Sequence, residues 1–179
     1  MQTTTRRARP YGWPQLCLAI ALSAITGCAP TSEAESIKGA WRLVHAEERD
    51  SAGKPSVKPV QSGFAFFTDM HYAVIWSQGT DPAAPFGTAW TPTDSERLER
   101  FDAFTANAGT YQINGSTLTA TPAVAKVPDF MGGSAIYDFA LEGDTLSLTY
   151  TRVVSRQGVP MAVYESGGRF EYRFVRLED

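Results

Sequence analysis

The chain has 179 residues and a formal net charge of −3, and 43% of its residues are hydrophobic. That length suits a single domain with a sizeable core. The acidic balance argues against nucleic acid as a partner, because binding to phosphates requires concentrated positive charge.

The N-terminal segment has the order of a secretory signal peptide. Three arginines at positions 6, 7 and 9 precede an apolar stretch that is too short to span a bilayer, and small residues follow it. The sequence Ile25-Thr26-Gly27-Cys28 resembles the lipobox of bacterial lipoproteins, a family whose signal is cut just before the cysteine. An ordinary signal peptide cut after Ala24 is the alternative.

The lipobox resemblance implies that residues 1–27 are removed and that the Cys28 sulfur carries acyl chains such as palmitate. Residues 28–36 would then form a flexible stalk, and residues 37–179 the folded domain. Loss of the three arginines lowers the formal charge from −3 to −6. We therefore expect the acyl chains alone to hold the protein to a membrane of the bacterial cell envelope. Ala29 after the cysteine implies sorting to the outer membrane, facing the periplasm.

The reactive side chains limit the chemistry of the domain. Cys17 lies in the predicted signal and Cys28 would be blocked by lipid, so we expect no disulfide and no cysteine nucleophile. His45 and His71 are the only histidines and form no metal-binding motif. We expect no metal, no other cofactor and a monomer, and the sequence assigns no catalytic residue.

Beyond the predicted stalk, short alternating runs are separated by turn residues, the pattern of antiparallel β structure. The hairpin around Asn114-Gly115 is typical, because both residues tolerate the positive φ of a type I′ turn. We predict eight strands, at residues 37–48, 63–68, 71–77, 109–113, 116–121, 135–141, 145–154 and 169–177.

One helix is predicted over residues 92–107, between the third and fourth strands. Thr91 is its expected N-cap, and Pro92 fits the first helical position. We expect it to cover either the flank of the sheet or one open end. Residues 78–90 and 122–134 lack a regular pattern, and such long loops either carry function or plug the end of the fold.

The first strand opens with Gly39-Ala40-Trp41, the Gly-x-Trp pattern of lipocalins. Residues 39–44, 108–115, 128–132 and 141–148 resemble, in order, stretches of the bacterial lipocalin-like domain family. The resemblance implies an all-β fold, an antiparallel eight-stranded up-and-down barrel, but no particular ligand. It also implies that Trp41 packs at the barrel floor against an arginine of the last strand. Arg173 and Arg176 are the candidates, and Arg176 is favoured because it shares a face with Phe170, Tyr172 and Phe174.

Alternation along the first strand places Leu43, His45 and Glu47 on the same face as Trp41. An eight-stranded barrel is either filled by its own side chains or hollow enough for one small ligand. Aromatic residues on several strands are expected inside, and most of them serve the core. Our candidate ligand-binding residues are Trp41, Leu43, His45, Tyr72, Tyr111, Tyr137 and Phe139.

The favoured function is binding of a small hydrophobic or amphipathic molecule by an envelope-anchored barrel. One alternative is a metal-independent enzyme of the isomerase or cyclase type, with a buried polar pair such as His45 and Glu47. The other is a filled barrel that meets protein partners through its two long loops.

Overall fold

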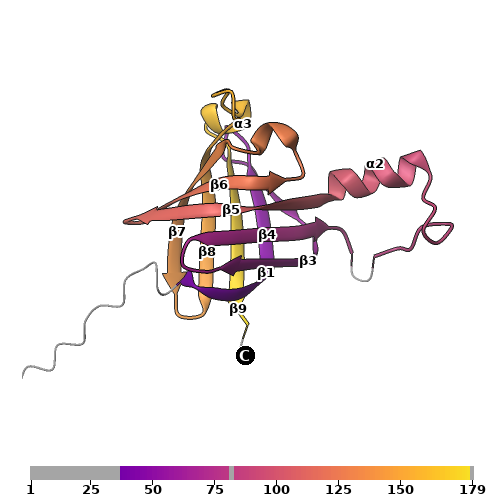
Figure 1. The fold of residues 1–179 in the computed structure, drawn as a ribbon, viewed down its shortest axis with the longest axis horizontal. Coiled ribbons are helices and arrows are strands. Elements are labelled where there is room, and N and C mark those ends of the chain that lie inside the picture. Colours follow the sequence, from indigo (N-terminus) through magenta and orange to yellow (C-terminus); the bar gives the residue numbers. More distant parts are fainter. Residues whose placement is uncertain (1–36, 81–82, 178–179) are drawn as a thin grey trace, which may run out of the picture. The chain divides into compact units, whose positions relative to one another are not determined.

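The computed structural model describes residues 37–80 and 83–177, all within the compact unit Thr31–Asp179 (Figure 1). The predicted signal peptide, Cys28 and the stalk lie outside the described residues. The strands are β1 (Gly39–Arg49), β2 (Pro55–Lys58), β3 (Val60–Phe67), β4 (His71–Gln78), β5 (Phe104–Asn114), β6 (Thr117–Ala125), β7 (Ser134–Glu142), β8 (Thr145–Val154) and β9 (Arg169–Arg176). The helical elements are α2 (Asp94–Ala103), the 3₁₀ turn η1 (Pro128–Phe130) and α3 (Ala162–Glu165).

The strands form a closed antiparallel barrel. Each strand from β3 to β8 pairs with the next one along the chain, and β1 pairs with β3 and β9. The short β2 and the end of β3 occupy one edge of β1 in succession, at Ala46–Arg49 and Gly39–Arg42, while β9 runs along the other edge. The barrel therefore has eight strand positions, as the sequence predicts, with the position after β1 divided between β2 and β3.

The predicted position of the helix is wrong, because α2 follows the fourth strand rather than the third. The additional strand is β2, which the alternation of residues 55–58 is too short to reveal. The helix is also shorter than expected. Its N-cap is Thr93, where a capping box forms: the Glu96 N–H donates to the Thr93 hydroxyl at 3.3 Å, and Glu96 Oε2 accepts the Thr93 N–H at 2.6 Å.

The end of α2 is set by the sheet. Phe104 pairs with Ser77 of β4, and extended backbone continues from there through Asn107. The sequence predicts a helix through residues 104–107, because their apolar spacing fits a helix as well as a strand. Pairing with β4 overrides this local preference and places Asn107 on the inner face of the barrel.

The helix does not cover the barrel. No residue of α2 is buried, and Leu98 and Phe101 are 62% and 51% exposed. Figure 1 shows α2 beyond the ends of β4 and β5 rather than over the sheet. The expectation that it lies on a flank or across an opening is therefore incorrect. No helix within residues 37–80 and 83–177 has the length and apolarity needed to cross a membrane.

The packed core fills the end of the barrel where β1 begins and β9 finishes. Alternate residues of the strands point inward and exclude water, which is the main source of stability for such a sheet. Trp41, Leu118, Leu146, Leu148 and Phe174 have almost no exposed surface. This end is closed, so any hollow must lie toward the other end.

Candidate functional site: a cavity at the open end of the barrel

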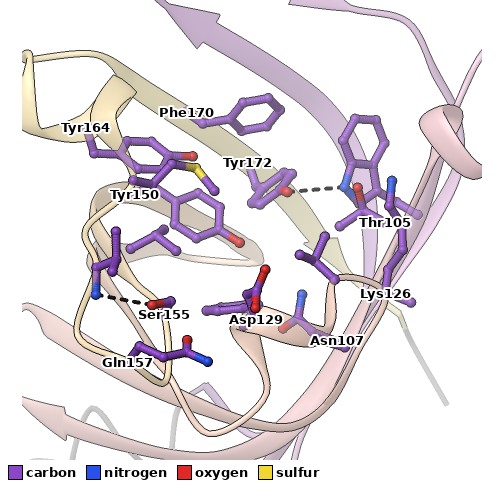
Figure 2. A pocket seen from close by; sticks show the side chains of 18 residues that line it. Thr105, Asn107, Lys126, Asp129, Tyr150, Ser155, Gln157, Tyr164, Phe170 and Tyr172 are labelled. Carbon is purple, nitrogen blue, oxygen red and sulfur yellow. Dashed lines mark hydrogen bonds between the residues drawn. The ribbon is translucent and has the colours of Figure 1, made fainter.

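A cavity of about 690 Å³ lies at the end of the barrel opposite the packed floor. β5 and β9 begin there, and β6 and β8 end there. The volume lies within the range of about 300–1,000 Å³ that is usual for small-molecule sites. The lining residues, shown in Figure 2, are Trp76, Thr105, Ala106, Asn107, Ala125, Lys126, Val127, Asp129, Phe130, Tyr150, Val153, Ser155, Gln157, Val159, Met161, Tyr164, Phe170 and Tyr172.

One wall is made by the extension of β6. The register between β5 and β6 shifts between Ala108 and Gly109, and this bulge accommodates Pro122 inside the strand. A Cβ on Gly109 would collide with the backbone carbonyl of Thr121, so the close approach of the two strands requires a glycine. The ladder then continues to Ala125 opposite Asn107, and both residues line the cavity.

Two loops border the opening. The first runs from Lys126 through η1, and the second runs from Ser155 to α3. They are joined by a hydrogen bond of 3.0 Å from the backbone N–H of Arg156 to the carbonyl of Asp129. Residues 122–134 are one of the two long segments that we expected to carry function or to plug the fold. This segment contributes both the end of a strand and part of the cavity wall.

Aromatic rings form the deeper wall. The Tyr150 ring stacks on Tyr164 with centroids 5.5 Å apart, and Phe170 packs against Tyr172 at 4.9 Å. The Trp76 indole N–H donates to the Tyr172 hydroxyl at 3.1 Å (Figure 2). Such rings offer large apolar faces with few rotatable bonds, which favours binding of apolar molecules.

The tyrosine hydroxyls of this wall are neutral at ordinary pH. Burial raises the pKa of Tyr150 and Tyr172 well above the usual value of 10.0, since ionisation would place a charge away from water. Burial also raises the pKa of Tyr164 to about 12, with a smaller contribution from the nearby Glu48 carboxylate. The wall can therefore form hydrogen bonds without carrying charge.

Charge is confined to the mouth of the cavity. The Lys126 ammonium donates to the carbonyl of Phe101 at 2.6 Å and lies 4.3 Å from the centre of that ring, so it is engaged by α2. Asp129 is exposed in the loop after β6. In the part of the chain that the structure describes, no three His, Cys, Asp or Glu residues come together as a metal site would require.

One polar group in the wall lacks a partner. The Asn107 amide oxygen is buried, and the described residues offer it no hydrogen bond. The whole residue is only 6% exposed, and it lines the cavity. Burial of an unpaired polar group is costly, so such a group in a cavity wall indicates a position where a bound molecule can supply the missing bond.

The predicted floor residues lie at the closed end. Trp41 is opposite Arg176 in the β1–β9 ladder, and the guanidinium lies 4.1 Å from the centre of the indole ring. Arg176 also donates to the carbonyl of Lys38 at 2.7 Å. Arg173, the other candidate, points to the outer face and pairs with Glu171 at 2.7 Å.

None of the seven candidate ligand-binding residues lines the cavity. Leu43 is buried in the core, and so are four aromatic candidates, Tyr72, Tyr111, Tyr137 and Phe139. They lie nearer the floor, where the barrel is filled by its own side chains. The hydroxyl of Tyr72 has no hydrogen-bond partner among the described residues, but Tyr72 does not border the cavity.

The remaining candidate, His45, faces outward. The register between β1 and β9 shifts between Leu43 and His45, so a bulge at Val44 reverses the alternation. Ala46 becomes the inward residue opposite Tyr172, while His45 and Glu47 share the outer face with Arg173 and Glu171. His45 Nε2 lies 3.6 Å from Glu47 Oε2. The expectation that these two residues point inward is incorrect, and they cannot serve as a catalytic pair in the cavity.

The cavity residues that sequence reasoning missed belong mostly to irregular segments. Asn107 was assigned to a helix, and Ser155, Gln157, Met161 and Tyr164 lie in a connection without a strand pattern. Trp76, Tyr150, Phe170 and Tyr172 had been expected inside the barrel, but not singled out as ligand contacts. The signal in the sequence is their position, because they are the aromatic residues nearest the open ends of their strands.

The sequence matches the lipocalin-like domain family over residues 38–159. The chain belongs to this family. A comparison with curated proteins gave no match. Among solved structures, a point mutant of the fluorescent protein UnaG is similar at 12% identity and a TM-score of 0.35, over 81% of this chain and 99% of that chain. At that score the likeness has no bearing on the function of this lipocalin-like barrel.

Proposed function

We propose that this protein binds a small hydrophobic or amphipathic molecule in the cavity at the open end of the barrel. The observation that supports the proposal is the cavity itself, about 690 Å³, walled by Trp76, Tyr150, Tyr164 and Phe170. A barrel whose only task was structural would gain stability by filling this space, because each fully buried large apolar side chain contributes about 1.5–3 kcal/mol. The alternative of a protein that meets partners through its loops requires a filled barrel. We therefore do not propose it.

Uptake of the neutral hydrocarbon dye diphenylhexatriene by the purified full chain tests this proposal. We expect saturable fluorescence with one dye per chain. Val153 lines the cavity on β8, so Val153→Trp fills part of the volume and should weaken uptake at least tenfold. The matched control is Ile75→Trp, which adds the same side chain on the exposed outer face of β4. Equal uptake by both variants and the native protein would contradict the proposal.

We further propose that the barrel is an exported lipoprotein, held through Cys28 to the bacterial cell envelope, at the outer membrane. The support is the order of the N-terminal segment: arginines, a short apolar stretch and the lipobox-like Ile25-Thr26-Gly27-Cys28. Tethering would keep the open barrel close to a bilayer, where apolar molecules concentrate.

Metabolic labelling with an alkyne analogue of palmitate tests the anchor. We expect Cys28→Ser to abolish labelling and to release the protein from the membrane fraction. Cys17→Ser, a change inside the predicted signal, should leave both unchanged. Retention of the label in Cys28→Ser would overturn the assignment of the lipidated residue.

A further inference from the structure

Asn107 lines the cavity, and its side-chain oxygen is buried without a hydrogen-bond partner among the described residues. It lies between Thr105 and Gly109 on the inner face of β5, opposite Val74 of β4 and Ala125 of β6. Both neighbouring side chains are apolar and offer no hydrogen bond. The amide oxygen therefore stays without a partner, although strand pairing fixes its position.

The described lining of the cavity disfavours an anionic ligand group next to Asn107. Among the described residues, and apart from tyrosines, the ionisable acid or base groups that line the cavity are Lys126 and Asp129. Lys126 is held by the Phe101 carbonyl and ring, and Asp129 is exposed at the mouth. A carboxylate buried next to Asn107 could accept only from the amide Nδ2 and would leave Oδ1 without a donor. Because the Lys126 ammonium is already bound to the Phe101 carbonyl, burial of that negative charge would be strongly unfavourable.

The apolar wall is placed to receive the rest of the molecule. Figure 2 shows the Asn107 amide on the opposite side of the cavity from Tyr164, with Tyr150 and Tyr172 between them. Met161 and Phe170 complete the apolar part of the lining. A molecule with one polar end and a hydrocarbon body fits this division of the cavity.

We propose that the ligand is an uncharged amphipathic molecule whose hydroxyl or amide N–H donates a hydrogen bond to Asn107 Oδ1. This inference rests on the proposed binding function and names its ligand class. A fatty alcohol, an acylglycerol or a fatty amide has the required donor. A free fatty acid, which is an anion at neutral pH, and its methyl ester have no such donor.

Displacement of bound diphenylhexatriene by three ligands with the same hydrocarbon chain tests the inference. Dodecanol donates a hydrogen bond, methyl laurate only accepts, and laurate is an anion. On the purified full chain we expect dodecanol to bind about tenfold more tightly than methyl laurate, and laurate to bind weakest. The dye itself has no hydrogen-bonding group, so its own uptake does not depend on a hydrogen bond to Asn107.

Two variants locate the effect. Asn107→Leu, of similar volume, should lose the preference for dodecanol over methyl laurate, whatever its own affinity for the dye. Gln112→Leu is the matched control, since it removes the same amide chemistry from the exposed outer face of the same strand, away from the cavity, and should keep the preference. The comparison of ligands on the native protein needs neither variant to fold.

The outcomes separate the inference from the function on which it depends. Dye uptake with equal displacement by all three ligands, or a preference for dodecanol that survives in Asn107→Leu, overturns the inference while the binding function stands. Tighter binding of laurate also overturns it. Failure of the native protein to take up dye and any of the three ligands defeats the proposed function, and the inference with it.

Discussion

The indole nitrogen of Trp76 and the hydroxyl oxygen of Tyr172 lie 3.1 Å apart, joined by a buried hydrogen bond from β4 to β9. The two rings meet edge to face with centroids 5.9 Å apart. Because both residues line the cavity, this single bond connects opposite parts of the barrel wall at the boundary between the packed core and the hollow end.

Removal of either partner of this bond should destabilise the fold. Tyr172→Phe leaves the buried indole N–H without an acceptor, and Trp76→Phe leaves the hydroxyl without its donor. We expect each to lower the free energy of unfolding by about 1–3 kcal/mol. Urea unfolding of both single variants and the double variant gives the coupling between them. Fully additive losses would show that the bond contributes nothing.

The floor contact between Arg176 and Trp41 should matter more than the ion pair on the outer face. Replacement by Met keeps much of the apolar volume but removes the guanidinium above the indole ring. We expect Arg176→Met to cost about 1–2 kcal/mol in unfolding free energy. Arg173→Met, which removes an exposed ion pair of the same strand, should cost less than about 0.5 kcal/mol. Similar losses of unfolding free energy in the two variants would show that the floor contact contributes no more to stability than the ion pair on the outer face.

The bulge that shapes the mouth depends on a glycine. Gly109→Ala places a methyl group against the carbonyl of Thr121, so the strands must move apart. We expect a loss of about 1–3 kcal/mol, measured by thermal and urea unfolding. At Gly87 the added Cβ would lie 3.5 Å from a Glu96 side-chain oxygen, an ordinary contact. Gly87→Ala is therefore the control, and an equal effect of both changes would rule out the steric explanation.

Alkaline pH should unfold the barrel through its buried tyrosines. Below about pH 10 both the folded and unfolded states keep the phenolic proton, so these groups give no pH dependence. Above it the unfolded chain ionises first, because burial raises the pKa of Tyr164 to about 12 in the folded state and those of Tyr150 and Tyr172 well above 10.0. Each such tyrosine should then lower the unfolding free energy by about 1.4 kcal/mol per pH unit.

Two signals followed together test the alkaline transition, namely the tyrosinate ultraviolet band and far-ultraviolet circular dichroism. We expect ionisation of the buried tyrosines to coincide with loss of β structure, between about pH 10 and 12 or higher. Ionisation of all tyrosines near pH 10 with the fold intact would show that these hydroxyls are open to solvent.

Much of the barrel could be predicted from the sequence, because its strands alternate and its hairpins carry turn residues. The run from Thr145 to Val154 is a local feature that the fold retains. The hairpin at Gly115 also forms, but its turn residues are Gly115 and Ser116, while the predicted turn residue Asn114 is paired with Thr117. What failed depended on pairing with distant residues. Phe104–Asn107 is extended because β4 lies beside it, and Pro55–Lys58 is a strand because β1 offers it an edge.

The site was less accessible from sequence for the same reason. The bulge at Val44 turns His45 outward, and nothing in the residues of β1 alone reveals the extra residue. The contact between Trp41 and Arg176 at the floor could be predicted from the family resemblance and from the alternation of inward and outward residues along the last strand. The cavity, in contrast, depends on which strand ends remain unfilled and on loops whose course is set by backbone contacts, such as that between Arg156 and Asp129.

The most direct test of binding at the open end is a crystal structure of the protein with an ω-iodinated long-chain alcohol. The anomalous signal of iodine marks the hydrocarbon end, and the density of the chain leads to the hydroxyl. We expect the iodine near Tyr164 and Met161 and the hydroxyl at Asn107, inside the cavity. Iodine on the exposed face of α2 around Leu98, with none among the aromatic residues of the cavity, would contradict a ligand site in the barrel.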